Sequence, residues 1–162
     1  EVAAGHAVAL LCEGDASLYA SASYALLALA ERHPACPVAV IPGITAVAAA
    51  AAAASSQGLP WPLALQQDAL LIRPTPDGAE ELAALLQRAC GEGMVLALLK
   101  LGHRWAWVRP LLAERGLLDA SLFAQRVGWP DQLLAPAAEV PADEQPYFSL
   151  LLIRQSWPAV LP

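Results

Sequence analysis

Two apolar runs, each followed by a turn that contains glycine, organise the first part of the chain. Residues 8–12 (Val-Ala-Leu-Leu-Cys) and residues 38–41 (Val-Ala-Val-Ile) carry no charged side chain. Unbroken apolar runs of this length are typical of strands that are buried on both faces of a parallel sheet. The turns at residues 13–15 (Glu-Gly-Asp) and 42–43 (Pro-Gly) follow them directly. Because parallel strands end at one edge of a sheet, where α/β folds bind ligands, both turns are predicted to border one site.

The remaining pattern alternates between strand and helix, which predicts an α/β fold. Residues 57–67, which contain glycine and two prolines, form the predicted boundary between two domains, 1–57 and 58–162. The helix expected at residues 79–90 is amphipathic, with its leucines on one face. The predicted strands are residues 6–12, 37–41, 68–72, 94–99, 122–127 and 148–153. The predicted helices are residues 17–32, 44–56, 79–90 and 105–115, with a helical turn at 130–134. Loops are predicted at residues 74–78 and 136–145, and a tail at 155–162.

Composition and charge exclude several classes of function. The 162 residues are 57% hydrophobic and carry a net charge of −6, which argues against binding to a nucleic-acid backbone. The longest apolar stretch, residues 44–54, is shorter than the roughly 18 to 20 residues that a membrane span needs. The three cysteines, Cys12, Cys36 and Cys90, lie far apart and lack metal-ligand spacing. We therefore expect reduced core thiols in a cytoplasmic protein, without a disulfide, a zinc site or a membrane segment.

The turn residues also resemble those of a known family. The segments Glu-Gly-Asp-x-x-x-Tyr at residues 13–19, Ile-Pro-Gly-Ile-Thr-Ala at 41–46 and Gly-Leu-Pro at 58–60 resemble the tetrapyrrole (corrin/porphyrin) methylases. Pro-Tyr-Phe-Ser-Leu at residues 146–150 is most similar to the branch that methylates precorrin-2 at carbon 20 in cobalamin biosynthesis. The resemblance implies two α/β domains with S-adenosylmethionine in the cleft between them. By this resemblance, the chain comprises the end of the N-terminal domain and a complete C-terminal α/β domain with a mixed sheet.

The resemblance also implies which residues border the ligands. Such a methylase holds its methyl donor and its tetrapyrrole acceptor together in a dry cleft and needs no catalytic triad or metal. No catalytic side chain and no metal site are therefore predicted, and the family implies a homodimer. The expected cofactor-binding residues are Glu13, Gly14, Asp15, Leu18, Thr45, Ala46, Lys100 and Gly128. The expected substrate-binding residues are Tyr19, Arg73, His103 and Arg104, with Arg126 as a further partner for a substrate carboxylate.

Several of these residues have structural explanations that the sequence alone leaves open. Asp15 could cap a helix that begins near Ser17, and Thr45 could cap the small-residue helix that follows it. Tyr19 could lie at the edge of a core. The tryptophans could stack on a macrocycle, but packing in the core is the favoured explanation for Trp105, Trp107 and Trp129.

Two departures from the family pattern affect these expectations. Ala16 stands where the family has proline, and the family's amino-terminal glycine-rich turn is not among these residues. We therefore expect that roughly the first third of a longer enzyme precedes Glu1, and that these residues alone bind S-adenosylmethionine poorly and transfer no methyl group. Three functions stay open: methylation of precorrin-2, methylation of another carbon or another acceptor, and a non-catalytic α/β module for dimerisation, which the high apolar content suggests.

Overall fold

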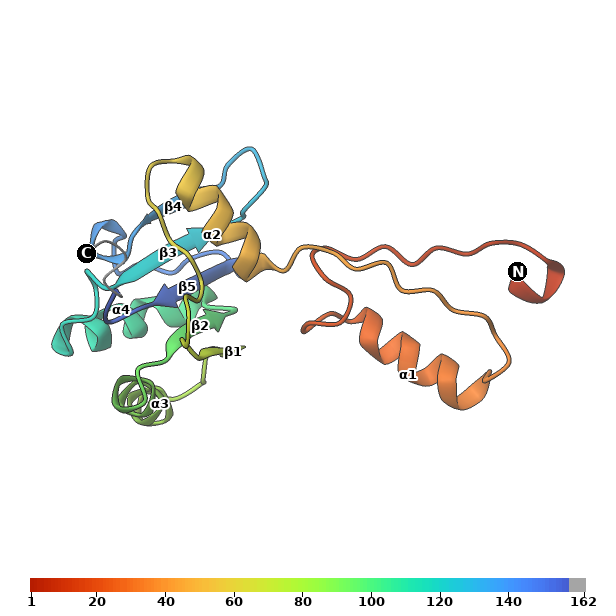
Figure 1. Cartoon of the computed structure of the whole chain (residues 1–162), viewed down its shortest axis with the longest axis horizontal. Coiled ribbons are helices and arrows are strands. Elements are labelled where there is room, and N and C mark those ends of the chain that lie inside the picture. Colours follow the sequence, from red (N-terminus) through yellow and green to blue (C-terminus); the bar gives the residue numbers. More distant parts are fainter. Residues whose placement is uncertain (158–162) are drawn as a thin grey trace. The chain divides into compact units, whose positions relative to one another are not determined.

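The computed structural model describes residues 1–157, and it divides the chain into two compact units. The first unit is Glu1–Ala46 and the second begins at Val47. The first unit contains helix α1 (Ala22–Arg32) and a short 3-10 helix, η1 (Val2–Ala4). The second unit contains a five-stranded sheet and the helices that pack on it (Figure 1). Helix α2 (Ala46–Ser56) belongs to this unit except for its first residue, Ala46. The domain boundary expected after residue 57 stays a prediction.

The sheet of the second unit is mixed, as expected for this fold class. Its strands lie in the order β1-β2-β5-β3-β4. β1 pairs with β2 in parallel, whereas β5 is antiparallel to both of its neighbours, β2 and β3. Strands β1, β2 and β3 therefore run in one direction and end at one edge of the sheet, where β5 begins. The strands are β1 (Leu70–Pro74), β2 (Val95–Leu99), β3 (Ser121–Gln125), β4 (Leu133–Pro136) and β5 (Ser149–Ile153).

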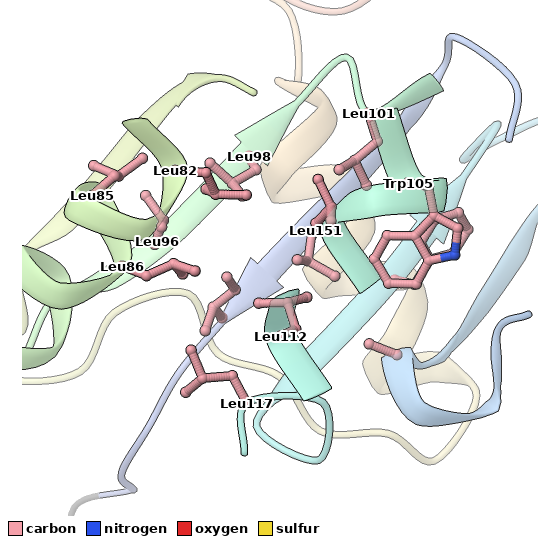
Figure 2. Packing of buried hydrophobic residues seen from close by; sticks show 14 of the residues in the cluster. Leu82, Leu85, Leu86, Leu96, Leu98, Leu101, Trp105, Leu112, Leu117 and Leu151 are labelled. Atoms are coloured by element: carbon pink, nitrogen blue, oxygen red, sulfur yellow. The ribbon is translucent and has the colours of Figure 1, made fainter. Parts of the chain in front are cut away.

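Helices cover both faces of this sheet. Leu82 and Leu86 of α3 (Ala79–Gly91) pack with Trp105 and Leu112 of α4 (Trp105–Glu114) on one face, against Leu151 of β5 (Figure 2). The next residues along the strands, Leu150 and Leu152, belong to a second cluster with α2. Side chains alternate between the two faces of a strand, so the two clusters lie on opposite sides of the sheet.

The alanine-rich sequence of α2 suits its position on the sheet. Ala50 and Ala54 are completely buried, and they pack with Ala97 of β2 and Ala124 of β3. Small side chains on both sides of the contact allow the helix backbone to approach the strands closely. The prediction of a helix at residues 44–56 is therefore confirmed, with a start two residues later.

The two strands predicted in the first unit are wrong. Residues 6–12 and 37–41 form no strand, and their apolar side chains are exposed, as shown by Leu11 at 90% and Ile41 at 85%. An apolar pattern indicates that a segment can be buried, but a strand exists only where a second strand accepts and donates its backbone hydrogen bonds. Within residues 1–157 no strand pairs with either segment.

Two further elements differ from prediction. Helix α1 begins at Ala22 and not at Ser17, because residues 15–20 turn back on themselves, with Leu18 N–H donating to the carbonyl of Asp15. The helical turn predicted at residues 130–134 is wrong, since this segment leads into β4, which pairs with β3. The other strands and helices of the second unit are confirmed to within two residues. The tail predicted at 155–162 lies partly outside the described residues.

Candidate functional site

The turns that follow the two apolar runs lie in contact, although the runs are not strands. The Gly43 N–H donates to Oδ2 of Asp15 at 3.0 Å. The other carboxylate oxygen of Asp15, Oδ1, accepts from the Ser17 N–H at 2.8 Å and from the Ser17 hydroxyl. One carboxylate therefore orders its own turn and ties it to a turn that lies 28 residues further along the chain.

Glycine is required where these two turns meet. A Cβ atom on Gly43 would lie 2.0 Å from the carbonyl oxygen of Gly14, a distance that real Cβ atoms do not reach. Gly14 has a φ of 72°, in the left-handed region that side chains disfavour. The backbones of the two turns are thus packed directly against each other, with no side chain between them.

Electrostatics favour the ionised form of Asp15. The hydroxyl of Ser17 has the largest effect, followed by the N–H groups of Ser17 and Gly43, and together they hold the pKa of the Asp15 carboxyl below its ordinary value of 3.8. Because all of these donors stabilise negative charge, the contact between the turns persists at neutral pH. The helix cap considered for Asp15 is wrong, since no helix begins at Ser17.

The other expected ligand residues of the first unit lie in or beside these turns. Glu13 is exposed and Leu18 is partly buried. Tyr19 is 47% exposed and has a positive φ of 53°. Thr45 directly precedes α2 and Ala46 is the first residue of that helix, so Thr45 occupies the position of a helix N-cap.

The expected ligand residues of the second unit gather at one edge of the sheet. Arg73 lies near the end of β1, and Lys100 follows β2 directly. His103 and Arg104 are in the 3-10 helix η2 (Gly102–Arg104), which comes next. Gly128 follows β3 by three residues. These residues are brought together because β1, β2 and β3 end at the same edge of the sheet.

Hydrogen bonds to the start of β5 fix the backbone at this edge. The Gly102 N–H donates to the hydroxyl of Ser149 at 3.1 Å, and that hydroxyl donates to the carbonyl of Pro146 at 2.7 Å. Lys100 and Arg126 both adopt left-handed backbone conformations, with φ of 59° and 46°. Such conformations in residues other than glycine cost free energy and concentrate at functional sites.

Three of the expected cationic side chains already have carboxylate partners in the chain. Arg73 pairs with Glu81 at 2.8 Å, and Arg104 donates from Nε to Asp77 at 3.0 Å. The Arg104 guanidinium lowers the pKa of Asp77 below its ordinary value. Arg126 pairs with Asp131 in the same way. A substrate carboxylate would therefore have to share or displace these partners.

An exposed row of aromatic rings lies at the same edge, and the core packing favoured for Trp129 is wrong. Trp129, Phe148 and Tyr147 are each 43% to 56% exposed. The ring centroids of Trp129 and Phe148 lie 5.8 Å apart, and those of Phe148 and Tyr147 lie 5.4 Å apart. The strand pattern assigned Phe148 to the core, but β5 begins one residue later and leaves the ring outside. Trp105, in contrast, is fully buried against Phe123, as its packing interpretation predicted.

Some classes of site are not found in the described part of the chain. Residues 1–157 contain no group of three His, Cys, Asp or Glu side chains that could hold a metal ion. No helix within the same residues has the length and apolar character needed to cross a membrane. Cys12, Cys36 and Cys90 form no disulfide, and they are exposed or partly exposed rather than buried in the core as expected.

Comparison with known proteins assigns the family. Residues 1–140 match the Tetrapyrrole (Corrin/Porphyrin) Methylases. The chain belongs to this tetrapyrrole methylase family. A precorrin-2 C(20)-methyltransferase from Sinorhizobium sp is 35% identical over 152 residues, which are 94% of this chain and 57% of that protein. The chain therefore spans little more than half the length of this relative.

Solved structures of methyltransferases share the fold. The methyltransferase CobJ superposes with a TM-score of 0.69 and 24% identity, and the match covers 95% of this chain and 66% of the CobJ chain. A uroporphyrin-III C-methyl transferase from Thermus thermophilus, solved in complex with S-adenosyl homocysteine, gives a TM-score of 0.54 and 22% identity, covering 88% of this chain and 63% of its own. At these identities the likeness concerns the fold.

Proposed function

We propose that the chain is part of a methyltransferase that uses S-adenosylmethionine to methylate precorrin-2 at carbon 20 in cobalamin biosynthesis. The observation that carries the proposal is the 35% identity over 94% of the chain to a relative with this activity in its name. The direct contact between the turns at residues 13–15 and 42–44 supports it, because both family motifs then border one place. An alternative within the family is methylation of another tetrapyrrole carbon.

The residues present suit this cofactor. S-adenosylmethionine, when bound, supplies a methyl group on a positively charged sulfur. Glu13 offers an exposed carboxylate beside the paired turns, and Leu18 offers a partly buried apolar surface. We assign the cofactor to Glu13, Gly14, Leu18, Thr45 and Ala46 in the first unit, with Asp15 beside them.

The edge of the sheet in the second unit supplies the remaining residues in this proposal. Lys100 and Gly128 both have a left-handed backbone, each just after a strand. The Lys100 carbonyl accepts from Arg104 and the Gly128 N–H donates to Gln132, so a ligand would use the other main-chain groups or displace these partners. We assign Tyr19, Arg73, His103 and Arg104 to the tetrapyrrole, as the family resemblance implies. His103 is exposed, and its side chain forms no ion pair among those found within residues 1–157, so a ligand would not have to displace a paired carboxylate from it.

No general base or metal is required from the chain. When bound, the cofactor would supply the methyl group for carbon 20, and the chain would only have to hold the two in line. The chain's contribution is to hold donor and acceptor at reacting distance and to exclude water.

The test uses the complete protein that contains these residues. It is incubated with precorrin-2 and S-adenosylmethionine carrying a 13C label on the methyl group. Mass spectrometry of the product counts the added methyl groups, and 13C NMR locates the carbon that bears them. One labelled methyl group at carbon 20 is expected. A label at another carbon would favour the alternative within the family, and no transfer to any tetrapyrrole would refute the proposal. Titration calorimetry of the 162 residues alone tests the expectation of weak cofactor binding, which micromolar affinity would contradict.

We also propose a homodimer in the cytoplasm. The resemblance to the family supports the dimer, and the unpaired cysteines suit a reducing compartment. A second candidate function, a non-catalytic dimerisation module, is favoured by the exposed apolar segments 8–11 and 38–41. Sedimentation together with the methyl-transfer assay distinguishes these possibilities. An active dimer supports the enzyme, an inactive dimer supports the module, and a stable monomer contradicts both.

A further inference from the structure

The carboxylate of Asp15 is largely occupied by the chain itself. An ionised carboxylate has about four lone-pair sites. Three hydrogen bonds already reach the Asp15 carboxylate, from the N–H and hydroxyl of Ser17 and from the N–H of Gly43. A direct bond to a ligand would have to use the last site or displace one of these donors.

The bond between Asp15 and Gly43 acts at the point of closest backbone approach. Gly43 lacks a side chain, and the carbonyl group of Gly14 occupies the space that a Cβ on Gly43 would need. Such a Cβ would lie 2.0 Å from the carbonyl oxygen of Gly14 and 2.9 Å from its carbonyl carbon. Gly14 in turn lies near Ile44, since its own Cβ would be 3.5 Å from the Ile44 carbonyl oxygen. The carboxylate thus fastens a contact that only glycine permits.

We propose that Asp15 is a positioning residue: its carboxylate clasps the turn at residues 13–15 to the turn at residues 42–44, and so sets the spacing of the backbone that borders the cofactor. This inference rests on the proposed function for the identity of the ligand, but not for the clasp itself. Asp15 acts through Gly43 and does not need to touch S-adenosylmethionine.

The clasp is tested first without any cofactor. In Asp15→Asn, the amide oxygen can still accept from Ser17, but the NH2 group faces the Gly43 N–H as a second donor, so this bond is lost. NMR spectra of the chain should show a large change in the Gly43 amide resonance and faster hydrogen exchange at that amide. The exposed Glu31→Gln on α1 is the matched control and should change neither. An unchanged Gly43 amide in Asp15→Asn would overturn the proposal.

The positioning role is tested by a double-mutant cycle on the complete gene product. Asp15→Asn and Gly43→Ala are each expected to weaken S-adenosylmethionine binding by roughly tenfold, measured by calorimetry, and to raise KM for the cofactor more than they lower kcat. Because both changes break the same contact, the double variant should bind about as weakly as either single variant. Glu31→Gln should bind normally.

The possible outcomes separate the two proposals. Additive losses in the double variant would mean that Asp15 contacts the cofactor independently of Gly43, and the positioning role would be refuted. If the wild-type protein binds no S-adenosylmethionine at all, the proposed function and the positioning role both fail, whereas the Gly43 amide resonance still decides whether the clasp exists. Non-additive losses together with a displaced Gly43 amide would support the proposal.

Discussion

Replacement of Trp105 by alanine should strongly lower the stability of the second unit against unfolding. The side chain is fully buried, its ring centroid lies 5.1 Å from that of Phe123, and its Nε1 donates to the carbonyl of Pro141 at 2.8 Å. Loss of a buried aromatic ring costs about 3–5 kcal/mol through lost burial and the cavity left behind. We therefore expect Trp105→Ala to lower the free energy of unfolding by about 4 kcal/mol, which corresponds to a fall in Tm of about 8–16 °C.

A conservative variant separates packing from hydrogen bonding at this position. Trp105→Phe keeps an aromatic ring against Phe123 but removes the N–H donor, and Pro141 is exposed, so water can replace the lost donor. Its expected cost is about 1–2 kcal/mol, mainly from the smaller ring. Trp129→Ala is the control, because this ring is 43% exposed and should cost less than about 1 kcal/mol.

The assay is urea unfolding followed by far-ultraviolet circular dichroism, with the slope m compared between variants. An unchanged m shows that the folded state has kept its extent. If Trp105→Ala cost no more than Trp129→Ala, then Trp105 would not lie in the core between α4 and the sheet, and the packing described for this face would be refuted.

Three further predictions concern the backbone at Lys100, the packing of α2 and two paired aspartates. Lys100→Gly should be about 1 kcal/mol more stable than Lys100→Ala in urea unfolding, because glycine relieves the left-handed backbone; equal stability would contradict the strain. Ala50→Leu should cost about 1–3 kcal/mol by overpacking the buried contact of α2 with the sheet, whereas Ala52→Leu on the exposed side should cost little; similar urea midpoints for the two would argue against this packing. The pKa of Asp68, lowered first by the Leu65 N–H and then by Arg154, and that of Asp77, lowered by Arg104, both lie below 3.8, so these groups stabilise the fold above that pH and the urea midpoint should fall as the pH drops through their lowered values. A midpoint that stayed constant over this range would show that these bonds are absent in solution.

Local sequence patterns sufficed for most of the second unit. The leucine spacing at residues 79–90 predicted α3 because a helix places such residues on one face, and the run at residues 94–99 predicted β2 because all of its side chains become buried. The same reasoning failed for residues 8–12 and 38–41, since an apolar run carries no information on whether a partner strand is present.

The candidate site shows the same division. Gly14 with Asp15, and Gly43 with Thr45, identified the two turns, and the sequence pattern predicted that the turns lie together, as they do. The reason given for this prediction was that each turn follows a strand, and this is wrong because the first unit has no strands. The sequence did not reveal that Asp15 would be occupied by Ser17 and Gly43, because the Gly43 donor lies 28 residues away.

By itself, the sequence determined the α/β class, most element positions and the glycine turns, because each depends on the spacing of nearby side chains. Only the tertiary structure decided which strands pair, which arginines are already neutralised by Glu81, Asp77 and Asp131, and which aromatic rings remain exposed at the sheet edge. The pair of Arg104 with Asp77 joins groups 27 residues apart, and the pairs of Arg73 with Glu81 and of Arg126 with Asp131 join groups eight and five residues apart. In each case the backbone fold, and not the spacing alone, brings the two charges within reach.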